Sequence, residues 1–267
     1  MSASGHRSKN ARPAAHASSP YVGIVTLFND FAWLITALWR SRNGVRRGAA
    51  AIAVALVCGV AAGAAQAQPQ SLSQSEGAAT AELRLMVIGD SLTAGFGLPA
   101  SRAFPAQLEA ALRAKGRVVR VLNAGVSGDT SAGGKARVEW ALADKPDAVL
   151  LELGANDGLR GIDPQSTYGN LAAILSALKA RGIPAFLAGM YAPPNLGAAY
   201  GTEFRAVYTR LAAEFDVPLY PFFLDGVAAQ PKLNQADGIH PNAEGVAVIV
   251  ARILPPLETW LARVRAK

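Results

Sequence analysis

Short apolar runs alternate with longer segments of helical periodicity from Glu82 to the end of the chain. Each run has the length of a strand, and we expect five strands, at 84–88, 118–122, 148–153, 185–188 and around 217–220. Strands that alternate with helices are joined by crossover connections, which make neighbouring strands parallel. The pattern therefore predicts an α/β fold, in which ligands bind beyond the carboxyl ends of the strands.

The helices between these strands are indicated by apolar side chains that recur every three or four residues. One helix should end at Gly116, and another should start at Asp163-Pro164 and end at Gly182. The last helix should begin at Pro241 and end or kink at Pro255-Pro256, because proline lacks a backbone N–H. The apolar stripes are expected to face the core: Phe104, Leu108 and Leu112; Leu171, Ile174, Leu175 and Leu178; Phe204, Val207, Leu211 and Phe215; Val246, Ile249, Val250 and Ile253.

The first predicted strand ends in Gly89-Asp90-Ser91, which places one hydroxyl at the end of a buried strand. A serine in such a turn is most often a turn residue or a helix cap. As a nucleophile it requires a base, a group that orients the base, and donors for a developing oxyanion. Ser91 is therefore a candidate nucleophile only if the chain supplies these groups.

The choice of base is narrow, because the chain has three histidines and two of them, His6 and His16, lie in a polar N-terminal stretch. His240 is the remaining candidate, since no other ordinary side chain titrates near neutral pH. Asp237 precedes it by three residues, a separation short enough for a single turn to present both side chains. An isolated Asp-x-x-His is more often a polar surface turn, but this one contains the one available base.

Candidate oxyanion donors follow the first three predicted strands, so their loops open at the same edge of the sheet. They are the backbone N–H groups of Ser91 and Gly128 and the side-chain amide of Asn156. Read singly, Gly128 could be an ordinary loop glycine and Asn156 a turn residue. Three neighbouring aspartates are expected to brace the loops through backbone N–H groups: Asp90, Asp129 and Asp157.

Four blocks in a fixed order, Gly89–Leu92, Asn123–Thr130, Gly154–Asp157 and Asp237–His240, resemble the GDSL or SGNH hydrolase family. The resemblance covers residues 83–262 and implies a flavodoxin-like three-layer α/β/α sandwich with a five-stranded parallel sheet, and no metal or cofactor. It implies ester hydrolysis by a triad of Ser91, Asp237 and His240, with an oxyanion hole of Ser91, Gly128 and Asn156. The second and third blocks are most similar to a secreted branch that includes thioesterase I/protease I/lysophospholipase and bacterial arylesterases.

The expected substrate is a small-molecule acyl ester or thioester. The apolar loop 189–197 suits a flap over an acyl chain, with Met190, Tyr191, Pro193 and Leu196 as candidate contacts, although a plain long loop explains it equally well. A carbohydrate or peptidoglycan O-acetyl esterase, or an acyl transferase to alcohols, would use the same five residues. A non-catalytic flavodoxin-like module could bind an anion through the glycine-rich loops, but it leaves no role for Asp237 and His240.

The N-terminal part of the chain has the composition of targeting segments. Residues 45–67 carry the basic, apolar and small-residue parts of a signal peptide, which predicts cleavage near Ala67 and a periplasmic or secreted enzyme. Residues 1–44 include a second apolar stretch, 21–39, which is either a membrane anchor or not normally translated. We expect residues 68–80 to form a polar linker and 81–267 the hydrolase domain.

Charge and cysteine content argue against nucleic-acid binding and against thiol chemistry. Seven of the 26 Lys and Arg residues, but only one of the 19 acidic residues, precede Gln68, so the predicted mature chain is nearly neutral. This balance excludes a nucleic-acid-binding footprint, and we expect no stable membrane insertion of the mature domain. The single cysteine, Cys58, lies in the predicted signal peptide, which leaves the mature chain without thiol nucleophiles or disulfides.

Overall fold

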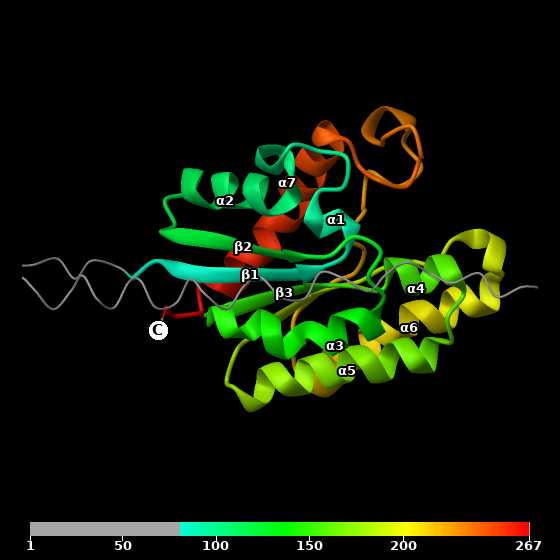
Figure 1. The fold of residues 1–267 in the computed structure, drawn as a ribbon, viewed down its shortest axis with the longest axis horizontal. Helices are drawn as coiled ribbons and strands as arrows, with labels where there is room; N and C mark the ends of the chain where they lie inside the picture. Colours follow the sequence, from blue (N-terminus) through cyan, green and yellow to red (C-terminus); the bar gives the residue numbers. More distant parts are fainter. Residues whose placement is uncertain (1–80, 267) are drawn as a thin grey trace, which may run out of the picture. The chain divides into compact units, whose positions relative to one another are not determined.

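The computed structural model describes residues 81–266, and the predicted N-terminal extension, signal peptide and linker at 1–44, 45–67 and 68–80 lie outside them. A single parallel sheet has the strand order β2-β1-β3-β4-β5 (Figure 1). This arrangement confirms the predicted α/β class and the five strands. The strands are β1 (Leu83–Gly89), β2 (Val119–Gly125), β3 (Ala148–Glu152), β4 (Ala185–Ala188) and β5 (Leu219–Tyr220).

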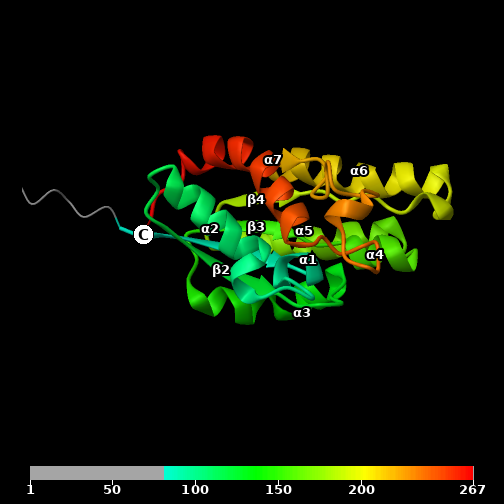
Figure 2. The same cartoon turned by 90° about the horizontal axis from the view of Figure 1, so that it is seen from above.

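Helices cover both faces of the sheet and make the predicted three layers. In Figure 1, α2 (Phe104–Ala114) and α7 (Ala243–Leu261) lie above the sheet, and α3 (Ser131–Ala141), α5 (Pro164–Ala180) and α6 (Ala198–Phe215) lie below it. Figure 2 shows α2 and α7 lying over the strands from above. Helix α2 packs on α7, and α5 packs on both α3 and α6. Short helices α1 (Ser91–Ala94) and α4 (Ala155–Arg160) follow β1 and β3.

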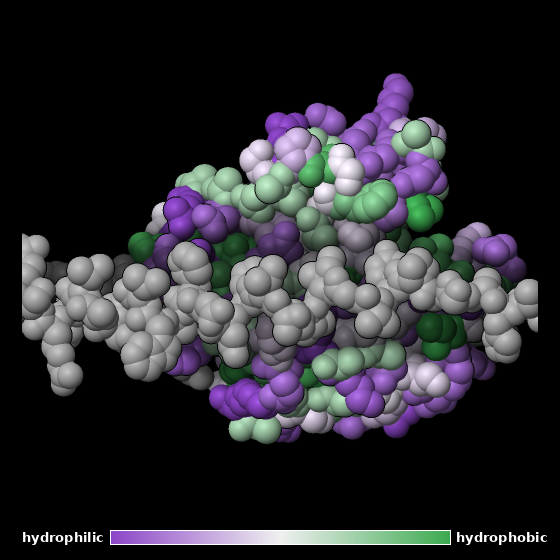
Figure 3. All heavy atoms as spheres, in the orientation of Figure 1, coloured by the Kyte–Doolittle hydropathy of each residue, from purple (hydrophilic) through white to green (hydrophobic). Residues whose placement is uncertain are grey.

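The core is formed by the central strands and by the predicted helix stripes. Every residue of β3 is buried, and all stripe residues are buried except Phe215, which is partly covered. Hydrophilic residues make up much of the face seen in Figure 3, with small hydrophobic areas between them. No helix within residues 81–266 is long and apolar enough to cross a bilayer.

Helices α7 and α3 differ from the prediction. Helix α7 begins at Ala243, where the side chain of Asn242 accepts the N–H of Gly245 at 2.9 Å as an N-cap. Of the two predicted alternatives at Pro255-Pro256, an end is wrong, because the helix continues to Leu261 with Leu257 and Leu261 buried in the core; a kink stays a prediction. Helix α3 was not predicted at all, since its sequence has two glycines and no long apolar stripe.

Candidate active site

The turn after β1 is shaped so that Ser91 begins a helix. Asp90 caps α1 by accepting the N–H of Leu92 at 3.0 Å, and Ser91 is the first helical residue. Position 89 at the end of β1 must be glycine, because a Cβ on Gly89 would lie only 2.0 Å from the hydroxyl of Thr93 and 2.4 Å from the carboxylate of Glu152. The chain therefore turns sharply at the end of a buried strand.

Ser91, His240 and Asp237 form one hydrogen-bonded chain. The Ser91 Oγ lies 2.9 Å from the His240 Nε2, and the His240 Nδ1 lies 2.7 Å from the Asp237 Oδ2. Hydrogen bonds from the backbone N–H and then the ring of His240 lower the pKa of Asp237 to about 2, so this carboxyl is ionised at neutral pH. The arrangement is that of a serine nucleophile, a base and an orienting carboxylate.

The three-residue spacing between Asp237 and His240 has a local structural cause. The second carboxylate oxygen of Asp237 accepts the backbone N–H groups of Ile239 and His240, each at 3.0 Å, which folds the side chain back over the turn. The loop is closed behind it by the Gln235 N–H, which donates to the His240 carbonyl at 2.7 Å. The ring of Phe96 contacts the imidazole at a centroid distance of 4.6 Å.

The predicted oxyanion donors lie in the three expected loops. The backbone N–H groups of Ser91 and Gly128 have no hydrogen-bond acceptor within the described part of the chain. Gly128 has φ of +85° and open space where a Cβ would stand, so glycine is required by its conformation and not by crowding. The Asn156 Nδ2 donates to the Asp129 carbonyl at 2.9 Å and to Asp90 Oδ2 at 3.3 Å.

The neighbouring aspartates brace the loops, although not only through backbone N–H groups. Asp157 is buried and accepts the backbone N–H of Ser131 at 2.8 Å and the hydroxyl of Thr167 at 3.1 Å. It therefore ties the start of α4 to α3 and α5. Asp129 pairs with Arg137 of α3.

A buried pair of carboxyl groups beneath Ser91 was not predicted. Glu152 ends β3, is fully buried, and accepts the Thr93 hydroxyl at 2.6 Å through Oε2, whereas its Oε1 has no hydrogen-bond partner among the described residues. Burial raises the pKa of Glu152 well above its ordinary value, and the nearby charge of Asp90 raises it further. Burial also raises the pKa of Asp90, to about 6. The sequence does contain a sign of this pair, namely an acidic residue inside the apolar run Leu150-Leu151-Glu152-Leu153. Acidic residues are almost never buried without partners, so a partner for Glu152 could have been expected.

An apolar cavity of about 480 Å³ opens beside Ser91 and His240. Three of the four candidate substrate contacts, Met190, Tyr191 and Pro193, line it. Leu196 does not, because a 3₁₀ turn at Pro194–Leu196 carries it toward Gly161 instead. Apolar side chains that the sequence analysis did not single out complete the wall: Leu159, Phe222, Leu224 and Ile239.

One side of the cavity is held by aromatic stacking. The ring of Tyr191 lies parallel to that of Phe222 at a centroid distance of 4.2 Å, with an interplanar angle of 4°. The guanidinium of Arg205 lies 5.5 Å from the centre of the Tyr191 ring. The loop after β4 is therefore packed against the segment after β5 at the position where a flap was predicted.

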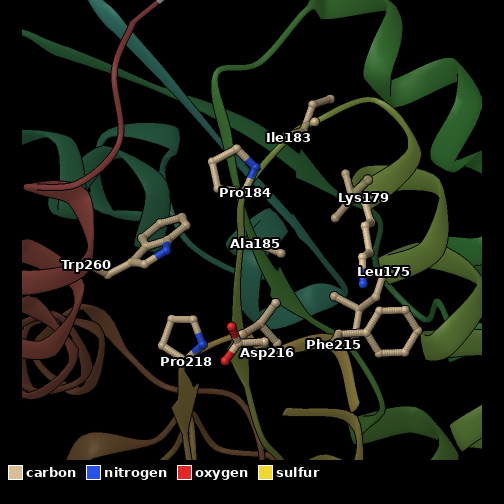
Figure 4. Close-up of a pocket in the computed structure, with 12 residues that line it drawn as sticks. Leu175, Lys179, Ile183, Pro184, Ala185, Phe215, Asp216, Pro218 and Trp260 are labelled. Carbon is tan, nitrogen blue, oxygen red and sulfur yellow. The ribbon is translucent and has the colours of Figure 1, made fainter. Parts of the chain in front are cut away.

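A second cavity, of about 330 Å³, lies at the opposite edge of the sheet, near the start of β4 (Figure 4). Its wall is mostly apolar, and its charged side chains are Lys179 and Asp216. No serine, cysteine or histidine lines it, so it offers no nucleophile paired with a base. The chemistry of an activated hydroxyl is therefore placed at the carboxyl edge of the strands.

Comparison with known proteins gives consistent results. Residues 87–248 match the GDSL-like lipase/acylhydrolase family. The chain is 45% identical over 183 residues to thioesterase 1/protease 1/lysophospholipase L1 of Escherichia coli K12, covering 67% of this chain and 86% of that protein. It is 40% identical over 181 residues to an arylesterase of Vibrio mimicus, covering 66% and 90%. The crystal structure of AlinE4, an SGNH-hydrolase family esterase, matches with a TM-score of 0.57 and 46% identity, covering 67% of this chain and 97% of that one.

Proposed function

This chain belongs to the GDSL-like lipase/acylhydrolase family, and from that premise we propose that it hydrolyses esters and thioesters of apolar acyl groups through an acyl-enzyme on Ser91. The observation that carries the proposal is the 2.9 Å contact between the Ser91 Oγ and the His240 Nε2 at the mouth of an apolar cavity. A hydroxyl so paired is the group that attacks a carbonyl carbon.

The proton follows the hydrogen-bonded chain. As the Ser91 Oγ attacks the carbonyl, His240 Nε2 takes its proton, and Asp237 stabilises the imidazolium through Nδ1–H. Collapse of the tetrahedral intermediate breaks the bond to the leaving alcohol or thiol, which receives the proton from Nε2. Water then attacks the acyl-enzyme as His240 takes its proton, and collapse of the second tetrahedral intermediate breaks the bond to the Ser91 Oγ, which receives that proton from His240 as the free acid leaves.

The negative oxygen of each tetrahedral intermediate requires donors that are already in place. The free N–H groups of Ser91 and Gly128 supply two, and the Asn156 amide supplies the third by exchanging its long 3.3 Å contact with Asp90 for the substrate oxygen. Removal of one such donor typically costs about 2.7 to 4 kcal/mol of transition-state stabilisation. Asn156 therefore carries a large share of the rate in this proposal.

The apolar wall favours acyl groups longer than acetyl. Burial of one CH₂ group is worth about 0.8 kcal/mol, so each added methylene should raise kcat/KM by up to about fourfold until the cavity is filled. An O-acetyl esterase of sugars would instead have its maximum at acetyl. Chain length therefore separates the two substrate classes.

The test is a series of nitrophenyl esters and acyl-CoA thioesters, from acetyl to dodecanoyl, with the Ser91→Ala variant as the blank. We expect kcat/KM to increase with chain length and to vanish in the blank. Leu159→Ser, in the cavity wall, should flatten this dependence, whereas Leu196→Ser, outside the wall, should not. A maximum at acetyl, or turnover that persists without the Ser91 hydroxyl, would contradict the proposal.

We propose further that the enzyme works outside the cytoplasm, after cleavage near Ala67. The support is the basic, apolar and small-residue order of 45–67. Intact-mass analysis of the protein from the periplasm or medium of its bacterial source should find a chain that starts at Gln68. A mature species that retains 21–39 and sediments with membranes would show an anchored enzyme, and an unprocessed cytoplasmic chain would refute export.

A further inference from the structure

Arg137 of α3 joins two loops of the active site although it touches neither Ser91 nor His240. Its Nη2 donates to the carbonyl of Gly89 at 2.9 Å, at the end of β1. Its Nε donates to Asp129 Oδ2 at 2.6 Å, in the loop after β2. Both side chains of the ion pair are 17% exposed, so it is shielded from solvent much better than the other Arg–carboxylate pairs of the described residues.

The two groups that Arg137 holds are adjacent to all three proposed oxyanion donors. Gly89 precedes Ser91 by two residues, and Asp129 follows Gly128 directly. The carbonyl of Asp129 also accepts the Asn156 amide at 2.9 Å. One guanidinium therefore bridges the two segments that carry or contact these donors, beside the backbone hydrogen bond from the Val126 N–H to the same Gly89 carbonyl at 3.1 Å.

We propose that Arg137 is a positioning residue for the oxyanion hole. This inference rests on the proposed function, because an oxyanion hole has a role only if Ser91 attacks a carbonyl. Donors contribute fully only when they are held within about 0.5 Å of the productive geometry. The planar guanidinium can hold two acceptors in fixed directions at once, whereas lysine presents a compact charge on a flexible stem.

A purely structural role would have a different signature. Loss of a brace that serves only stability lowers the melting temperature and leaves kcat unchanged at temperatures where the protein is folded. Loss of a brace for the oxyanion hole lowers kcat with little change in KM, because the donors meet a charge that is present only in the transition state. The two roles are therefore separated by kinetics on folded protein.

The experiment compares Arg137→Met and Arg137→Lys with a matched control, Arg113→Met. Arg113 also joins a strand carbonyl to carboxylates, since it donates to Val119 O at 2.8 Å and pairs with Glu82 and Glu109, but it lies near the start of β2, away from the site. We expect Arg137→Met to lower kcat on a soluble butyryl ester by about 10- to 100-fold, below the full effect of losing a donor. KM should change less than threefold, Arg137→Lys should recover part of the loss, and Arg113→Met should retain kcat.

A trifluoromethyl ketone gives a second measurement, because its adduct with Ser91 carries an oxyanion. Its inhibition constant should rise in Arg137→Met by the same factor as kcat/KM falls. Circular dichroism and thermal unfolding establish that each variant is folded at the assay temperature. If Arg137→Met is not folded, the kcat and inhibition constant of Arg137→Lys decide between the two roles. A folded variant with unchanged kcat and unchanged inhibition would overturn this inference and leave the proposed function standing. Wild-type hydrolysis that does not depend on Ser91 would overturn the proposed function instead.

Discussion

Replacement of Asp90 by asparagine should stabilise the protein above pH 6 but not at pH 4. Asp90 is fully buried beside Glu152, and burial raises its pKa from 3.8 to about 6. Between these two pH values the native protein binds more protons at this site than the unfolded chain does. The free energy of unfolding therefore falls as the pH rises from about 4 to 6, and the cost of the buried charge is fully present above pH 6.

The size of the effect follows from the shift. About two pKa units at 1.36 kcal/mol each give about 3 kcal/mol of destabilisation by the charged form at pH 8. Asparagine keeps an oxygen for the Leu92 N–H but loses the 3.3 Å contact with the Asn156 amide, which costs about 1 kcal/mol. We therefore expect Asp90→Asn to raise the free energy of unfolding by about 2 kcal/mol at pH 8 and to lower it by about 1 kcal/mol at pH 4, where the charge contribution is absent and the lost contact remains.

Urea unfolding of both proteins at one-unit steps from pH 4 to pH 8 measures this difference. Asp225→Asn is the control, because that carboxylate is exposed and pairs with Arg252 on the surface. Its effect should stay within about 1 kcal/mol, without the rise above pH 6 that is expected of Asp90→Asn. An Asp90→Asn variant that is less stable than wild type at pH 8 would show that hydrogen bonds outweigh the burial of the charge, and the reasoning would be wrong.

Three other predictions concern catalysis. Ser91→Ala should abolish hydrolysis without lowering the melting temperature, and His240→Ala should be nearly as severe. The double variant should be no worse than either single variant, because the residues act as a unit. Additive losses of activity in steady-state assays would contradict this. Asn156→Ala should lower kcat by about 10²- to 10³-fold with little change in KM. Weaker binding at unchanged kcat would make Asn156 an ordinary substrate contact. Hydrolysis should persist in EDTA, and inactivation that added metal reverses would refute the metal-free mechanism.

The sheet could be predicted because its strands are short apolar runs that end in glycine or polar residues. In parallel strands that are buried on both faces, consecutive residues are apolar. This holds for Leu85–Ile88 and Ala148–Leu151. The loops that carry Ser91, Asn156 and His240 could then be placed at one edge of the sheet. Their hydrogen-bond distances could not, because these depend on how the loops pack.

Helix α3 could not be predicted from its sequence, and the reason is physical. Three of its four buried residues are small, namely Ser131, Gly134 and Ala141, and Gly134 lies so close to Leu153 that a Cβ there would be 2.2 Å from that side chain. A helix that approaches a sheet through glycine has neither an apolar stripe nor good intrinsic helix propensity. For Leu196 the sequence predicted a contact that the structure does not have. This apolar residue is close in sequence to residues that line the cavity, but a 3₁₀ turn directs its side chain away from the cavity.

The residues that hold the site loops in place, such as Glu152 and Arg137, were the hardest to predict. Their partners come from other segments of the chain, and a sequence motif does not show which segments pack together. Glu152 accepts the hydroxyl of Thr93 at 2.6 Å, so it holds the turn that carries Ser91. An apolar residue in its place would fill the space but leave the Thr93 hydroxyl buried without this acceptor, at about 1–3 kcal/mol. This hydrogen bond is one reason why an acidic residue is tolerated in a strand that is otherwise entirely apolar. The other is protonation, because burial and the nearby charge of Asp90 raise the pKa of Glu152 and so favour its neutral form, which is the form that a strand interior tolerates.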